Sequence, residues 1–151
     1  MLDANKMTEP ELERMFKREV EKVDGLCYKF ISPGNAGVPD RAVIFPTGLV
    51  FFCELKRTGE RLRPLQRKVC RDIHHNHGIV LEVVGVLGVA RMLMYAGYQD
   101  SALALAQKYK LNKDKVLEAF NDDWWAIRHF IPAKVNKDFE QEIERMRKDG
   151  V

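Results

Sequence analysis

Two short stretches decide the fold of this chain: Gly-Val-Pro-Asp at residues 37–40 and Glu-Leu-Lys at residues 54–56. Side chains of a β-strand alternate between its two faces, so Glu54 and Lys56 project from the same face. The apolar run at 49–53 precedes them and predicts a central strand that is buried on both faces. Charged groups at the end of such a strand cost several kcal/mol unless they are paired or bound to a partner. A divalent metal ion is one such partner.

The bulk composition describes one globular domain. The chain has 151 residues, 46% of them apolar, which is enough to bury a hydrophobic core without disulfides or a structural metal. A net charge of +3 leaves no long basic tail, so any basic surface must be local. The three cysteines are Cys27, Cys53 and Cys70. They are far apart and lack CxxC spacing, which argues against a disulfide framework or a zinc site and fits a reducing cytosol. No stretch approaches the roughly 20 apolar residues of a membrane span, so we expect a cytoplasmic protein without membrane contact.

The order of predicted elements is α-β-β-β-α-β, which is typical of an α/β core with a mixed sheet. Thr8 and Glu11 form a capping-box pattern around Pro10 and predict a helix that ends near residues 24–25. The remaining core elements are strands at 26–31, 41–45 and 49–56, a hairpin turn at 46–48, a helix from Pro64 to Gly78, and a strand at 79–84.

After Gly88 the sequence reads as helical throughout, with breaks near Gly97, Asn112 and Pro132. Helices are predicted at 89–96, 99–110, 113–130 and 137–148. The chain therefore divides into a core at 1–88 and an all-α appendage at 89–151.

The charged residues of the two stretches suit the chemistry of divalent metal ions on phosphate. Mg²⁺ prefers oxygen ligands, and Asp40, Glu54 and the backbone carbonyl of Leu55 would supply three. Lys56 is placed to orient or deprotonate an attacking water, or to stabilise negative charge. The alternative is an exposed salt bridge of a carboxylate with Lys56, which contributes under about 1 kcal/mol. The Gly-x-Pro-Asp turn at hairpin distance favours the metal site.

Three runs together resemble the VRR-NUC domain of the PD-(D/E)xK nuclease superfamily, particularly its compact phage and bacterial versions. They are Gly-Val-Pro-Asp-Arg at 37–41, Phe-Phe-Cys-Glu-Leu-Lys at 51–56 and Pro-Leu-Gln at 64–66. Residues 28–34 also match the stretch that precedes the Pro-Asp turn in such proteins. The resemblance covers about residues 9–85 and implies a restriction-endonuclease-like core; it does not cover residues 89–151.

The resemblance implies Mg²⁺- or Mn²⁺-dependent DNA cleavage with Asp40, Glu54 and Lys56 as the catalytic trio. It also implies a glutamine on the following helix, here Gln66, and an acidic residue on the first helix. Alignment with the family pattern selects Glu13 for that acidic residue. Helical geometry offers Glu19 instead, because it lies amid the apolar face of the helix, so both remain open.

Several cations and glycines near these motifs are candidates for DNA contact, although some of the cations would be ordinary solvated charges. They are Lys29, Arg41, Arg57, Arg61 and Arg63, with the backbone N–H groups of Gly34 and Gly37. The phage and bacterial relatives suggest a homodimer that cuts branched DNA such as four-way junctions. The alternatives are a monomeric flap or end nuclease and a catalytically silent DNA-binding module.

Overall fold

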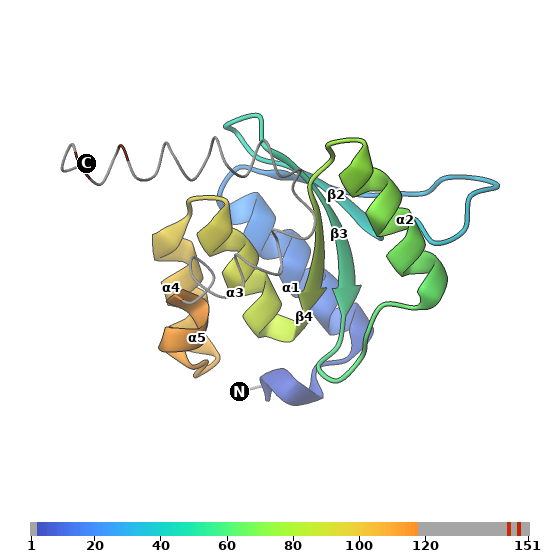
Figure 1. The fold of residues 1–151 in the computed structure, drawn as a ribbon. Coiled ribbons are helices and arrows are strands. Elements are labelled where there is room, and N and C mark those ends of the chain that lie inside the picture. Colours follow the sequence, from blue (N-terminus) through green and yellow to red (C-terminus); the bar gives the residue numbers. More distant parts are fainter. Residues whose placement is uncertain (1–2, 118–144, 146–147, 149–151) are drawn as a thin grey trace.

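Four strands form one mixed sheet in the order β1-β2-β3-β4 (Figure 1). The computed structural model describes residues 3–117, 145 and 148. The strands are β1 (Leu26–Lys29), β2 (Arg41–Ile44), β3 (Val50–Lys56) and β4 (Val80–Val84). Strand β2 pairs antiparallel with both β1 and β3, and β4 pairs parallel with β3. The predicted mixed sheet, with the Glu-Leu-Lys strand at its centre, is confirmed.

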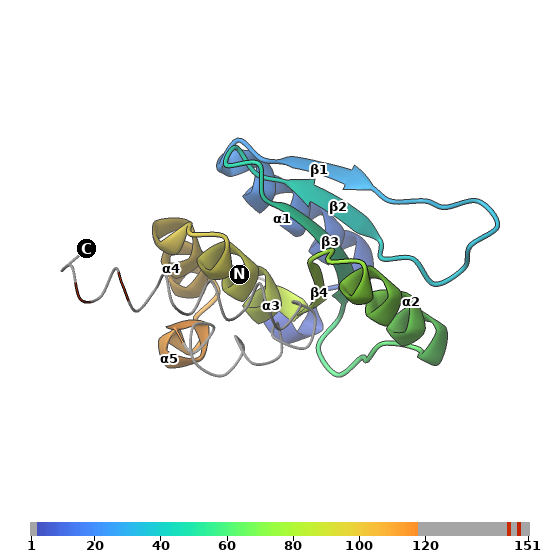
Figure 2. The same cartoon turned by 45° about the horizontal axis from the view of Figure 1, so that its top comes forward.

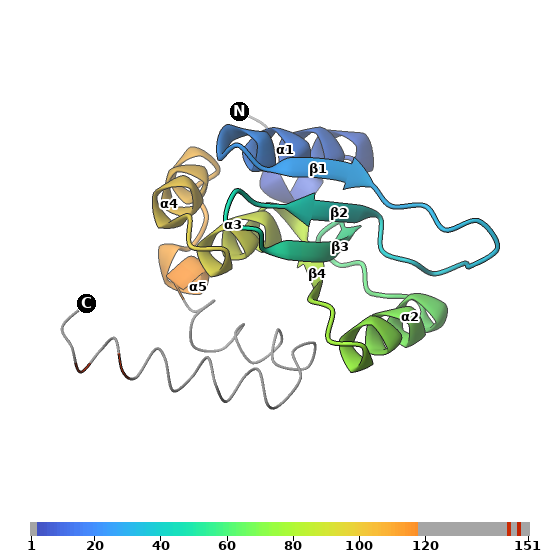
Figure 3. The same cartoon turned by 90° about the horizontal axis from the view of Figure 1, so that it is seen from above.

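Helices cover both faces of the sheet, as the view in Figure 3 shows. The helices are η1 (Ala4–Lys6), α1 (Glu9–Lys22), α2 (Pro64–His75), α3 (Gly85–Tyr95), α4 (Gln99–Lys108) and α5 (Lys113–Leu117). One core joins α1 and α3 to the face that carries Phe51, Cys53 and Leu55. A smaller cluster places Cys70 of α2 against Val80 on the opposite face. The chain therefore has the α/β architecture that its element order predicts.

The predicted helix start at Thr8 is confirmed in detail. The backbone N–H of Thr8 donates to Glu11 Oε2 at 2.7 Å, and the Glu11 N–H donates to Thr8 Oγ1 at 3.4 Å. This reciprocal pair satisfies two donors that the first turn of a helix leaves without partners. Since α1 begins here, its buried stripe of Leu12, Met15 and Phe16 packs against the sheet.

The β2–β3 hairpin sets the register of the most informative residues. Arg41 lies opposite Cys53 and Ile44 lies opposite Val50, so the pairing is symmetric about Thr47. The same register carried one residue outward places Asp40 opposite Glu54. Residues opposite each other in an antiparallel pair project from the same face. The two carboxylates therefore meet on the face that α2 covers.

The helices after β4 share the core of the sheet. Val89 and Leu93 of α3 and Leu105 of α4 are buried in the same cluster as α1 and the strands. The boundary predicted after residue 88 falls inside α3, and the division into a core and an appendage stays a prediction. The helix predicted at 113–130 is described only as far as Leu117. The helix predicted at 137–148 lies outside the described residues except for positions 145 and 148.

No helix within the described residues has the length and apolar character that a membrane span requires.

Candidate active site

Asp40 and Glu54 are joined by reciprocal hydrogen bonds between the ends of two strands. The backbone N–H of Asp40 donates to Glu54 Oε2 at 3.1 Å. The backbone N–H of Leu55 donates to Asp40 Oδ2 at 3.2 Å. Glu54 is only 2% exposed, whereas Asp40 is half-buried. The backbone of each strand thus fixes the carboxylate of the other, which orients both groups.

Lys56 completes a buried charge cluster with Glu54. Its Nζ lies 3.6 Å from Glu54 Oε1, and Lys56 is only 7% exposed. An exposed salt bridge therefore does not describe this pair. Removing one partner of a buried pair leaves the other charge uncompensated, which is strongly destabilising. Because water is largely excluded from this position, the ammonium group of Lys56 is the group that balances the charge of Glu54.

Gln66 ties the start of α2 to the same carboxylate. Its Nε2 donates to Glu54 Oε1 at 2.8 Å, and its Oε1 accepts from the backbone N–H of Arg63 at 2.9 Å. Because Oε1 is engaged by a donor, the amide has one orientation, with the NH₂ group toward Glu54. Gln66 therefore adds a hydrogen bond to the carboxylate without adding charge.

Burial is the main reason why the pKa of Glu54 rises, to about 7, and the negative charge of Asp40 raises it further. The ammonium group of Lys56 and the Asp40 N–H lower it, but they do not compensate. The site therefore carries more negative charge, in less water, than its own cation balances. A bound cation would relieve this repulsion.

The donor set fits a hard divalent cation such as Mg²⁺. Asp40 and Glu54 supply carboxylate oxygens, and Mg²⁺ is usually held by one or two carboxylates with several retained waters. The N–H and C=O groups of one strand residue point to the same side. The Leu55 carbonyl therefore points to the side where its N–H meets Asp40. Within the described part of the chain, no three His, Cys, Asp or Glu side chains form a candidate metal cluster.

Comparison with known proteins finds similar sequences and structures. A phage protein named "Putative nuclease p44", from Acyrthosiphon pisum secondary endosymbiont phage 1, is 47% identical over 74 residues, which are 48% of this chain and 80% of that protein. A solved structure described as "VRR_NUC domain" superimposes with a TM-score of 0.55 at 25% identity, covering 58% of this chain and 95% of that one. No protein-family model matches the chain.

This chain belongs to the VRR-NUC nuclease family.

The two candidates for the acidic residue of α1 make different contacts in the structure. Glu13 Oε2 lies 3.6 Å from the guanidinium of Arg41, the residue that follows Asp40. Glu19 is buried and bonds Lys22 on its own helix at 3.0 Å. It lies six residues farther along α1, about 9 Å from Glu13 along the helix axis. Glu13 is therefore at the catalytic end of the sheet, but on the face opposite Glu54 and Lys56.

The candidate DNA-contacting residues of this VRR-NUC chain fall into two groups. Arg41 is 7% exposed and points toward α1, so its environment is that of a buried ion pair. The other cations are exposed around the site: Lys29 at the end of β1, and Arg57, Arg61 and Arg63 between β3 and α2. Arg57 also pairs with Glu60 at 2.6 Å. Gly34 is exposed in the loop between β1 and β2, and Gly37 is half-buried against α2.

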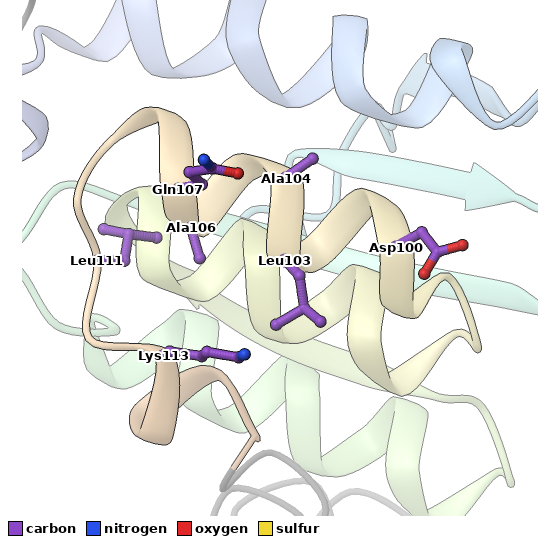
Figure 4. A pocket seen from close by; sticks show the side chains of 7 residues that line it. All are labelled: Asp100, Leu103, Ala104, Ala106, Gln107, Leu111 and Lys113. Atoms are coloured by element: carbon purple, nitrogen blue, oxygen red, sulfur yellow. The ribbon is translucent and has the colours of Figure 1, made fainter.

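A separate cavity of about 530 Å³ lies beside α4 and α5 (Figure 4). Asp100 and Lys113 are the charged residues of its wall, and Leu103, Ala106 and Leu111 contribute apolar surface. The set lacks the paired carboxylates of the β3 site.

Sequence reasoning missed the backbone donors of the site, the N–H groups of Asp40 and Leu55. The signal that predicts them is the hairpin, since a turn centred on Thr47 places Asp40 opposite Glu54. It also missed the groove that Val38 and Leu65 line beside the site. No pattern in the sequence indicates that contact.

Proposed function

We propose that this VRR-NUC protein is a Mg²⁺-dependent endonuclease that hydrolyses phosphodiester bonds in DNA. The observation that supports it most is the buried cluster of two carboxylates and a lysine at the end of β3. The phage relative is itself named a nuclease, in agreement with this activity.

The proposed roles follow from the contacts. Asp40, Glu54 and the Leu55 carbonyl hold Mg²⁺, for which Mn²⁺ substitutes. When bound, the ion supplies charge neutralisation at the scissile phosphate and a more acidic water. The ammonium group of Lys56, fixed by Glu54, orients the attacking water and stabilises the charge that develops on phosphate. Gln66 is a positioning residue because it holds Glu54 Oε1.

Glu13 is the acidic residue that α1 contributes in this proposal. In the structure it reaches Arg41 rather than the carboxylates themselves. Because Arg41 is joined directly to Asp40, the ion pair fixes the backbone that carries the first metal ligand. Glu13 thus acts as a positioning residue.

The substrate in this proposal is branched DNA such as a four-way junction, cut by a homodimer in the cytoplasm of a bacterium or phage-infected cell. Exposed cations next to the site support contact with DNA: Lys29, Arg57, Arg61 and Arg63. Phosphate contacts of this kind make binding strongly dependent on salt. A monomeric nuclease for flaps or ends is the second candidate, because the described site contains all its catalytic residues within one chain.

The test is cleavage of labelled four-way junction, flap and linear duplex DNA with Mg²⁺, Mn²⁺ or EDTA. Wild type is expected to cut in either metal and not in EDTA, and Asp40→Asn is expected to be inactive. Sedimentation of the protein–DNA complex distinguishes a dimer on junctions from a monomer on flaps. Binding without cleavage of any substrate would contradict the nuclease and indicate a silent DNA-binding module.

A further inference from the structure

A groove of about 450 Å³ lies beside the catalytic cluster, between α2 and the loop that joins β1 to β2. Figure 2 shows this loop extending past the end of the sheet next to α2. The residues that line the groove are Ser32, Gly34, Asn35, Ala36 and Val38 from the loop and Leu65, Lys68, Val69 and Asp72 from α2. Its volume lies within the range of small-molecule sites, about 300–1,000 Å³.

Hydrogen bonds and packing contacts hold the loop between β1 and β2 in place. Its neck is closed by the Phe30 N–H, which donates to the Asp40 carbonyl at 2.8 Å, and by the Phe30 ring against Phe52. Near its tip, Asn35 donates to Ser32 Oγ at 3.0 Å. Gly37 has φ +90°, and a Cβ there would lie 2.8 Å from Leu65 Cγ. Only glycine allows this approach, so the loop rests directly on the first turn of α2.

Each wall of the groove includes a residue that is close in sequence to the active site. Val38 is two residues before Asp40, and Leu65 is next to Gln66, which bonds Glu54. A group bound in the groove is therefore next to the residues that hold the scissile phosphate in the proposed function.

The chemistry of the walls differs from that of a phosphate-binding track. Ala36, Val38, Leu65 and Val69 present apolar surface, and Leu65 is 48% exposed although it is a large hydrophobic residue. The polar atoms come from Ser32, Asn35, Lys68 and Asp72. Phosphate contact needs cations and N–H donors, not apolar walls. A nucleobase combines apolar faces with a polar edge and matches both parts of this lining.

We infer that this groove receives one unstacked nucleobase of the DNA strand whose phosphate lies at Asp40 and Glu54. The inference rests on the proposed function and deepens it, since it names what the site recognises beside the phosphate. Taking a base out of a duplex costs stacking and pairing energy, and the cost is least for a base that is already unpaired. The groove therefore selects DNA with an unpaired nucleotide next to the cut, such as a branch point or a flap.

The experiment places 2-aminopurine, whose fluorescence increases when it leaves the base stack, at each position near the mapped cleavage site. Binding is followed with Ca²⁺ as the metal ion. Wild type is compared with Ala36→Phe, which fills the groove from an exposed position, and with Ala104→Phe, a matched change at an exposed alanine of α4.

The expected result is a fluorescence increase at one position for wild type and Ala104→Phe and none for Ala36→Phe. Ala36→Phe also loses affinity for flap DNA roughly tenfold, as removal of one base contact implies, while its affinity for paired duplex is unchanged. An equal increase with Ala36→Phe, or no increase at any position while wild type cleaves, overturns the inference and leaves the nuclease intact. Wild type that neither binds nor cuts any DNA overturns both.

Discussion

Glu54 is the residue on which the site converges. It accepts from the Asp40 N–H and from Gln66, and it pairs with Lys56, all while 2% exposed. Its buried charge faces that of Asp40, which is why its pKa is raised to about 7. Without metal, the ionised site therefore destabilises the fold. The hydrogen bonds and the ion pair of Glu54 reduce this destabilisation.

The stability of the metal-free protein is predicted to fall as pH rises from about 4.5 to about 7. In this window the folded protein holds a proton on Glu54 that the unfolded chain has already released, so the stability contribution is present at low pH and is lost as pH rises through the folded pKa. Urea unfolding in EDTA at several pH values measures this. Glu54→Gln is expected to flatten the slope in that window, and an unchanged slope in the variant would count against the assignment.

Gln66→Leu is predicted to lower apparent Mg²⁺ affinity by about 10–100-fold, since it removes a bond that orients a ligand. The readout is the Mg²⁺ dependence of cleavage, which a general loss of folded protein would not shift. Lys108→Ala, at an exposed lysine of α4, is the control and is expected to behave as wild type. The same Mg²⁺ midpoint in Gln66→Leu and wild type would show that Gln66 has no positioning role.

At the scale of elements, the β2–β3 hairpin could be predicted from the sequence, but its packing against neighbouring elements could be predicted only in part. The turn at 46–48 and the strand lengths imply pairing about Thr47, and the structure shows that pairing. The side of the sheet to which Arg41 turns could not be predicted, because a cation next to the Pro-Asp turn also fits a phosphate contact. Its burial against α1 depends on the ion pair with Glu13, a contact distant in sequence.

Gly37→Ala is predicted to destabilise the protein by about 1–3 kcal/mol, because alanine is strained at φ +90°, and its Cβ would also clash with Leu65. Gly34→Ala is the matched control, since its φ is +80° but no atom lies within 4 Å of the added Cβ. Thermal unfolding and cleavage of both variants measure the difference. Equal effects would mean that the loop does not depend on its contact with α2.

At the scale of the whole molecule, the fold brings residues from three separate segments together on one face of the sheet, while Glu13 lies on the other face. Asp40 ends a loop, Glu54 and Lys56 end a strand, Gln66 begins a helix and Glu13 lies on α1. Motif spacing singled out Asp40, Glu54 and Lys56, since strand alternation is a local property, whereas Gln66 and Glu13 came from the family resemblance. The packing of α3 and α4 into the same core as the sheet is set by tertiary contacts that no local pattern encodes.

Mg²⁺ is predicted to stabilise the whole fold by mass action. A ligand at 100 times its Kd adds about 2.7 kcal/mol to the free energy of unfolding if it binds only the folded state. The melting temperature of wild type is therefore expected to rise with Mg²⁺ concentration, and that of Asp40→Asn is not. A rise of equal size in both proteins would place the ion elsewhere.

The most direct test of the central claim, that the Asp40–Glu54–Lys56 cluster is a catalytic centre, is single-turnover cleavage by Lys56→Ala and Lys108→Ala in saturating Mg²⁺. Lys56→Ala is predicted to cut about 10²–10⁴-fold more slowly than wild type, as expected for loss of a group that serves the attacking water. Lys108→Ala is predicted to cut at the wild-type rate. Folded Lys56→Ala that cuts as fast as wild type would contradict the account.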